Sequence, residues 1–221
     1  MLAACLLTTS DSRHMAARMA ALGAREVMTF PFGLQALPGV AGAKVEHLFF
    51  ANRGLEALYA PERVLAVFAA VHAAWPEAQL VIANDGALRA PLQQEVRARG
   101  LANAVHFVGR LDAAAQDHWY ATATWYLSLP RSDSVSVSVL EAMAHGCIPL
   151  LSDLPANREL VDSGRNGLLL ADGALADLAA LDALQARAED VAAANRAWIA
   201  EHALFAPSVR AYLQRLRELL A

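Results

Sequence analysis

Cysteine and surplus charge are both scarce in this sequence. Only two of the 221 residues are cysteines, and no His/Cys spacing supports a metal, so neither a disulfide framework nor a zinc site is expected. Cys5 and Cys147 each lie in an apolar run, which predicts two buried thiols in a reducing compartment. A net charge of −4 and a pI near 6.0 exclude the global basic field of a nucleic-acid-binding protein.

A secretory leader and a membrane-length hydrophobic run are also missing. The apolar start, residues 1–7, has no basic segment before it and is too short to span a bilayer. We interpret residues 2–7 as a buried strand. A cytoplasmic protein is therefore expected, and peripheral contact with a membrane is left open.

What the chain does contain is a large apolar fraction. Hydrophobic residues make up 57% of the sequence, charged residues 18%, and the mean hydropathy is +0.31. A chain of this length and composition can bury a core, which excludes intrinsic disorder. It suits one large domain, or one domain with a piece of another.

Short apolar runs alternate with amphipathic segments through most of the chain. We predict strands at residues 45–51, 79–83, 105–108, 125–129, 148–151 and 167–170. The helices between them are predicted at residues 61–75, 87–99, 113–122 and 136–145, with a helical turn at 157–161. Continuous apolar strands between helices predict an α/β fold with a doubly wound parallel sheet, covered on both faces. Ligands of such sheets bind at the carboxyl ends of the strands.

A segment rich in Pro and Gly, residues 31–44, is interpreted as a hinge or linker. It separates an N-terminal piece, residues 1–30, from the main domain, residues 45–206. The piece should hold a helix over residues 10–22, capped by Ser10 or Asp11, and a strand over 26–30. The tail should be helical, with a break at Pro207 before a last amphipathic helix over residues 207–221.

The segment from residue 130 to 146 is the most informative chemically. A serine-rich turn follows a predicted strand and leads into a helix, whose first N–H groups have no partners and therefore bind anions. Serine hydroxyls in this turn add donors, and Asp133 and Glu141 bracket it, eight positions apart. Phosphate on the N–H groups, with carboxylates accepting from sugar and ribose hydroxyls, suits a phosphorylated sugar.

This spacing resembles the acidic-x7-acidic motif of retaining GT-B glycosyltransferases, family 4 especially. Five further segments resemble that family in order, at residues 52–53, 81–86, 105–109, 140–153 and 157–167. The resemblance implies a Rossmann-like domain, the C-terminal, nucleotide-sugar-binding half of the GT-B fold. It implies glycosyl transfer from a nucleotide-diphosphate sugar to an acceptor that the sequence does not identify, with no metal or other cofactor.

The resemblance also implies roles for individual residues. Asp133 would hold the donor sugar hydroxyls, Glu141 the ribose hydroxyls, and Arg53 the diphosphate, for which its planar fork is well suited. These three would form the catalytic set, which stabilises the departing nucleotide diphosphate without a protein nucleophile. The remaining donor-binding positions would be Ser134, Ser136, Val137, Ser138, Gly86, Val108 and Gly109, the last two presenting backbone to the base.

Two departures from the family keep other functions open. Leu58 stands where the family usually has a lysine, and Asp133 stands where it more often has a longer glutamate. A sugar-nucleotide-binding or regulatory module without turnover is therefore the alternative, whereas an epimerase would need an acid/base pair that we do not find. His145 lies one turn after Glu141, and we expect a structural pair between them.

A GT-B enzyme binds its donor in one domain and its acceptor in another, and residues 1–30 resemble the last elements of the acceptor domain. We therefore expect a missing N-terminal domain or a partner chain to complete the enzyme. The apolar stripe of the last helix, which contains Tyr212 and Leu216, would be covered by that partner or by self-association into a homo-oligomer.

Overall fold

Six parallel strands form the main sheet, in the order β5-β4-β3-β6-β7-β8. The computed structural model describes residues 4–31, 33–39 and 42–221. The chain builds the sheet outward from β3 to β5 and then returns to β3's other side with β6, which is the doubly wound order. The predicted fold class is confirmed. The strands are β3 (Val45–Ala51), β4 (Gln79–Ala83), β5 (Val105–Gly109), β6 (Ala123–Ser128), β7 (Ile148–Ser152) and β8 (Leu168–Leu170).

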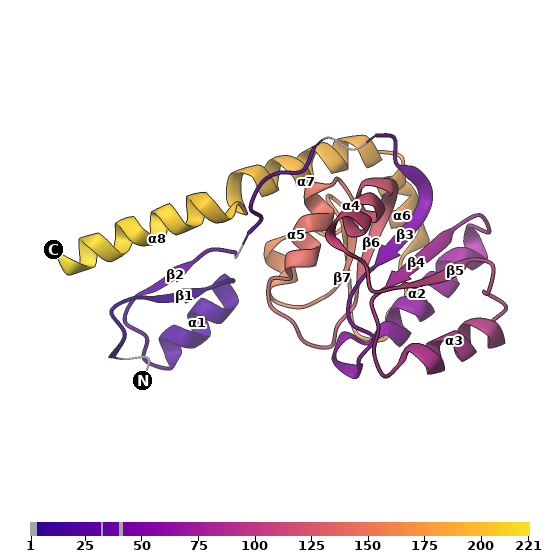
Figure 1. Ribbon diagram of the computed structural model, residues 1–221, viewed down its shortest axis with the longest axis horizontal. Helices are drawn as coiled ribbons and strands as arrows, with labels where there is room; N and C mark the ends of the chain where they lie inside the picture. The colour runs from indigo at the N-terminus through magenta and orange to yellow at the C-terminus, as the bar shows by residue number, and fades with distance from the viewer. Residues whose placement is uncertain (1–3, 32, 40–41) are drawn as a thin grey trace.

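Helices cover both faces of this sheet (Figure 1). One face packs against α2 (Pro61–Ala74), α3 (Arg89–Ala98) and α6 (Leu178–Gln185), and the opposite face against α4 (Ala113–Thr122), α5 (Val137–Ala144) and α7 (Ala188–His202). Successive strand residues point to opposite faces. Phe49 accordingly joins one core and Phe50 the other, so both must be apolar.

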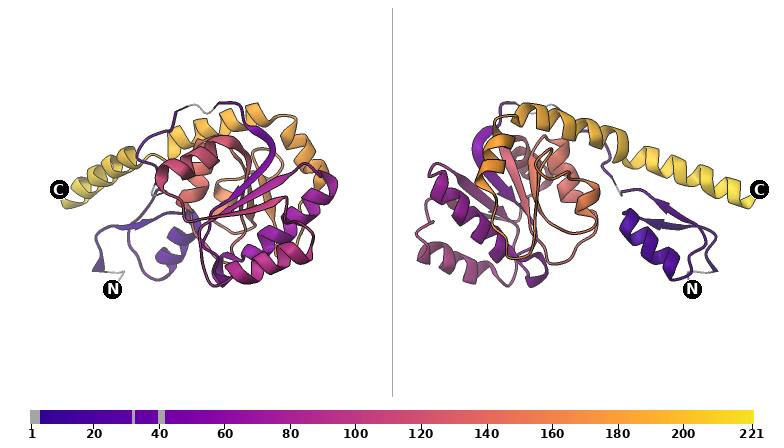
Figure 2. Two further views of the ribbon diagram at one scale, coloured as in Figure 1. Left: turned by 45° about the vertical axis from the view of Figure 1, so that its right-hand side comes forward. Right: turned by 180° about the vertical axis from the view of Figure 1, so that it is seen from behind.

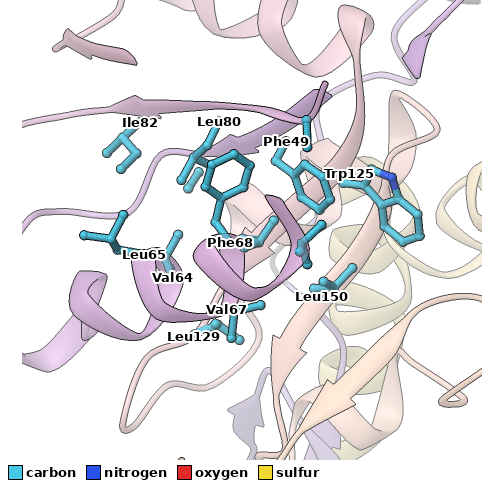
Figure 3. Packing of buried hydrophobic residues seen from close by; sticks show 14 of the residues in the cluster. Phe49, Val64, Leu65, Val67, Phe68, Leu80, Ile82, Trp125, Leu129 and Leu150 are labelled. Carbon is cyan, nitrogen blue, oxygen red and sulfur yellow. The ribbon is translucent and has the colours of Figure 1, made fainter. Parts of the chain in front are cut away.

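Aromatic rings fill the first of these cores (Figure 3). Phe49 meets Phe68 of α2 edge-on, with ring centroids 5.7 Å apart, and stacks on Trp125 of β6 at 5.7 Å. All three side chains are fully buried. This packing holds α2 over one face of β3 and holds β6 beside β3 in the sheet. It thereby sets the positions of the loops that follow β3 and β6.

A second, smaller sheet precedes the main one. β1 (Thr8–Ser10) pairs in parallel with β2 (Val27–Thr29), and α1 (Arg13–Ala21) joins them; residues 8–29 are called the N-terminal unit below. The strand predicted at residues 2–7 is wrong over residues 4–7, because the first strand is Thr8–Ser10; residues 2 and 3 lie outside the described part. Ser12 rather than Ser10 or Asp11 caps α1, by accepting from Met15 N. Cys5 is exposed, so the expectation of two buried thiols holds only for Cys147.

The segment that follows the N-terminal unit contacts the main domain where α7 ends. Leu34 pairs with Leu204 in an isolated parallel bridge, between α7 and α8 (Phe205–Leu220). The predicted break at Pro207 is wrong, because this proline lies in the first turn of α8, where its missing N–H costs no helical hydrogen bond. The break comes instead at the pairing with Leu34.

The last helix, α8, projects from the main domain beside the N-terminal unit (Figures 1 and 2). It has no buried residue. Arg215 on α8 reaches Glu26, just before β2, at 2.8 Å. Over the described residues, no helix is long and apolar enough to cross a membrane.

Candidate functional site

An open groove lies where the sheet changes winding direction. The loops after β3 and β6 leave neighbouring strands toward opposite faces, which opens a crevice at their carboxyl ends. The groove has a volume of about 510 Å³. Its lining comes from these two loops, from the start of α5 and from nearby elements: Asn52, Arg53, Gly54, Tyr59, Asn84, Gln116, Asp133, Val135, Ser136, Val137, Ser138 and Glu141.

Arg53, directly after β3, lies at the centre of the groove wall. Its Nη2 pairs with Asp133 Oδ2 at 2.7 Å, and its Nη1 donates to Ser136 Oγ and, at 3.1 Å, to Ser138 Oγ. The guanidinium lies 4.5 Å from the ring centre of Tyr59. Its Nε is buried without a hydrogen-bond partner among the described residues. Arg53 therefore joins the loop after β3 to the loop after β6 and to the start of α5.

The start of α5 faces the same groove. Ser136 is the N-cap residue, but its hydroxyl does not cap the helix, since it is engaged with Arg53 and with Ser138 Oγ at 2.8 Å. Ser136 O accepts from Val139 N at 3.1 Å, so the cap residue leaves the N–H groups of Val137 and Ser138 unsatisfied, and together with the helix dipole they favour an anion. The Arg53 guanidinium, the hydroxyls of Ser136 and Ser138 and the N-terminus of α5 therefore lie together on one wall of the groove.

Glu141, one turn further along α5, is held by a chain of buried hydroxyls and amides. Tyr120 donates to Glu141 Oε2 at 3.0 Å and accepts from Asn52 Nδ2 at 2.7 Å. Tyr126 donates to Asn52 Oδ1 at 2.7 Å, and Asn52 Nδ2 also donates to Gln116 at 2.7 Å. One oxygen of Glu141 is thereby fixed, which leaves Oε1 for a hydroxyl of a ligand.

Burial raises the pKa of both groove carboxyls. For Asp133, burial is the main cause, and Arg53 and the Ser134 N–H oppose it. For Glu141, burial is again the main cause, and the Tyr120 hydroxyl opposes it. Both groups are thus carboxylates whose charge depends on specific donors, and losing those donors would favour protonation.

Besides Ser134, three predicted donor-site residues do not line this groove. Gly86 packs between loops, since a Cβ built on it would lie 2.4 Å from Leu55 O. Val108 and Gly109 end β5, where Gly109 O accepts from Asn84 N at 2.6 Å. Their ligand-binding roles stay predictions. The other predicted donor-binding residues line the groove apart from Ser134, which lies next to it.

The expected pair between His145 and Glu141 is wrong. His145 Nε2 lies 3.4 Å from Asp117 Oδ1, and its ring stacks on Tyr120. Glu141 turns toward the groove because Tyr120 fixes its other oxygen. Burial is the main cause that lowers the pKa of His145, and Asp117 opposes it.

The sequence analysis assigned no site role to Tyr120 and Gln116, which lie on the helix predicted at residues 113–122, and it included Asn52 only in the segment 52–53 that resembles the family. Tyr120 approaches Glu141 only once α4 crosses back over the sheet. Leu58, in place of the family lysine, is 52% exposed. Among the described residues, no group of three or more His, Cys, Asp or Glu side chains could hold a metal ion.

The comparisons with known proteins agree with this geometry. The fold is the Rossmann-like domain of GT-B glycosyltransferases. Residues 43–192 match the family model described as Glycosyl transferases group 1, which is more than half of the chain, and the chain therefore belongs to this family. A search of curated proteins finds no match.

Solved structures with the same fold are distant in sequence. The pneumococcal O-GlcNAc transferase GtfA, in complex with UDP and GlcNAc, has a TM-score of 0.75 and 16% identity over 97% of this chain and 45% of that chain. Anabaena HepE in complex with UDP has a TM-score of 0.79 and 15% identity, over 97% of this chain and 64% of that chain. Sucrose-phosphate synthase from Thermosynechococcus elongatus has a TM-score of 0.80 and 19% identity, over 99% of this chain and 59% of that chain. This chain thus spans 45–64% of the length of these proteins.

Proposed function

We propose that the groove binds a nucleotide-diphosphate sugar and that the chain is the donor-binding part of a retaining glycosyltransferase of family 4 type. The proposal rests on one observation: Arg53, two serine hydroxyls and the α5 N-terminus converge beside two carboxylates. The first three suit a diphosphate, and the carboxylates suit the hydroxyls of ribose and of the donor sugar.

In this proposal the chemistry is charge stabilisation of the leaving group. As the bond between the sugar and the diphosphate breaks, negative charge grows on the diphosphate. The first N–H groups of α5 already face that position, and the Arg53 guanidinium reaches it by leaving Asp133, so both stabilise the growing charge. No metal is required, and we expect nucleotide affinity to be unchanged by EDTA.

A second candidate function is a binding module without turnover. The observation that favours it is Leu58, an exposed apolar residue at the position where the family usually has a lysine. One cation that would bind the diphosphate is therefore missing. In the glycosyltransferase proposal, by contrast, an acceptor and a further domain or partner chain that holds it are also required. A module would bind donors and neither hydrolyse nor transfer them, even with an acceptor domain supplied.

Calorimetric titration with UDP, GDP and ADP, and with their glucose conjugates, tests donor binding. We expect binding of at least one pair, and Arg53→Ala should weaken the diphosphate by about 10- to 150-fold while sparing the nucleoside, because a charged hydrogen bond is lost. Arg53→Lys is the matched control, which keeps the charge but loses the fork and should recover only part. No binding by the wild type to any of the six compounds would overturn the proposal.

A further inference from the structure

Asp11, in the N-terminal unit, reaches across to the loop that carries Asp133. Its Oδ1 accepts from Ser134 Oγ at 2.6 Å, and its Oδ2 accepts from Val135 N at 3.3 Å. These contacts join positions 123 and 124 residues apart in the sequence. A single carboxylate thus takes two donors from consecutive residues of the groove loop.

The Asp11 side chain is placed by its neighbours. Ser10 Oγ donates to Ser12 O at 2.8 Å and accepts from Ser12 N, and both serines are buried. Ser12 takes the role of N-cap for α1. Asp11 is therefore not needed as a cap, although it has the residue type for one, and its carboxylate is left to face the loop.

The loop is held from both sides as a result. Asp133 Oδ1 accepts from Ser134 N at 3.0 Å, while its Oδ2 pairs with Arg53. Asp11 satisfies the next hydroxyl and the next N–H along the chain. Without Asp11, the Val135 N–H, on a residue only 9% exposed, would lose its acceptor, and an unpaired buried donor is costly.

The N-terminal unit is also anchored independently of Asp11. Glu159, after β7, accepts from Arg13 N at 3.0 Å and from His14 N at 2.9 Å, at the N-terminus of α1. This contact docks the unit without touching the groove loop. The chain thus offers a matched control, a second carboxylate contact between the same two parts.

We propose that Asp11 is a positioning residue, which sets the conformation of residues 133–135 and thereby couples the placement of the N-terminal unit to recognition of the donor sugar. This inference rests on the proposed function. Asp11 accepts from Ser134 and Val135 and has no hydrogen bond to Arg53 or Glu141, so its effect belongs to Asp133 and to the sugar that Asp133 would hold. Any movement of the N-terminal unit would then change sugar recognition more than nucleotide recognition.

Amide hydrogen exchange of the full chain without ligand gives the first test. Asp11→Ala should speed exchange of the Val135 amide by about 10-fold, the loss of one hydrogen bond. Asp11→Asn, which keeps one acceptor oxygen, should have a smaller effect and guards against misfolding. Glu159→Gln should speed exchange at Arg13 and His14 and leave Val135 unchanged.

Calorimetry with UDP, GDP and ADP and their glucose conjugates gives the second test. Asp11→Ala should weaken the intact donor by about 10-fold and the diphosphate by less than about 2-fold. Equal losses for both ligands in Asp11→Ala would overturn the inference, as would wild-type exchange at the Val135 amide in that variant. A wild type that binds none of these compounds would instead overturn the proposed function, and the exchange experiment would then decide alone whether Asp11 orders the loop.

Discussion

Arg53 is paired before any ligand is present, which determines what a change at its partner does. Asp133 neutralises part of its charge at 2.7 Å. Asp133→Asn should therefore release Arg53 and leave the affinity for a free nucleotide diphosphate unchanged or higher. The same variant should weaken the intact sugar donor by about 1–3 kcal/mol, because a charged acceptor for the sugar hydroxyls is lost.

Glu141→Gln is the control for that comparison. Ribose is common to the diphosphate and to the intact donor, so this variant should weaken both by a similar amount. Calorimetry with each ligand separates the two patterns. Equal weakening of both ligands by Asp133→Asn would show that Asp133 does not hold the sugar.

Tyr120 controls the charge of Glu141, and a pH profile detects this. Burial raises the pKa of Glu141, while the Tyr120 hydroxyl bond favours its ionised form. Tyr120→Phe removes that bond, so the pKa rises further and the carboxyl protonates at a higher pH. Nucleotide binding that needs the carboxylate should then be lost at a higher pH than in the wild type.

The matched control for this change is Tyr126→Phe. It also loses one buried hydroxyl, but that hydroxyl bonds to Asn52 and not to Glu141. Its pH profile should follow the wild type much more closely. Titration of diphosphate affinity between pH 4 and 8, a range that brackets ordinary and raised carboxyl pKa values, is the measurement. Coincident profiles for Tyr120→Phe and wild type would contradict the role of Tyr120.

At the scale of elements, hydrophobic patterning predicted the main domain well. β3, β4 and α4 have the predicted bounds, and the other strands and helices of the main domain up to β8 differ by one or two residues at their ends. Apolar runs bounded by Gly or Pro leave little freedom there. The positions of Arg53 and Asp133 at the groove were predictable because each lies in a loop that follows a strand, and that of Glu141 because it lies on the helix after the serine-rich turn. Their roles came from the resemblance to the family and stay predictions.

The N-terminal unit and the Tyr120 network were not predictable in the same way. The apolar residues 2–7 suggested a strand, but the pairing that makes β1 is with β2, and it selects Thr8–Ser10. The hydroxyl of Tyr120 meets Glu141 only through the crossover that places α4 beside α5. Neither contact has a local pattern, since each depends on tertiary packing.

Gly86 illustrates a constraint between elements. The turn after β4 packs on the loop after β3, where Leu55 O accepts from Leu88 N at 2.9 Å, and a Cβ on Gly86 would lie 2.4 Å from that same oxygen. Gly86→Ala should lower the free energy of unfolding by about 1–3 kcal/mol, as overpacking does. Gly39→Ala, with no atom within 4 Å of the added Cβ, is the control. Denaturant unfolding of both variants tests this, and equal stabilities would contradict it.

At the scale of the whole molecule, the N-terminal unit and α8 stand apart from the main sheet (Figure 1). An ion pair between Arg215 of α8 and Glu26 of the N-terminal unit joins these two parts. The unit contacts the main domain where Asp11 accepts from Ser134 and where Glu159 accepts from the start of α1. These links are polar and few. Reading residues 1–30 as the end of an acceptor domain, and residues 31–44 as a hinge, stays a proposal that these contacts make physically coherent.

The central claim is that the groove between β3 and β6 holds the diphosphate of a nucleotide sugar. The most direct measurement is a crystal structure of the chain with UDP, GDP or ADP bound, whichever binds most tightly. We predict phosphate oxygens within hydrogen-bond distance of the first N–H groups of α5 and of Arg53, with ribose hydroxyls on Glu141. A nucleotide bound elsewhere, with Arg53 still paired to Asp133 and the α5 N-terminus uncontacted, would contradict the account.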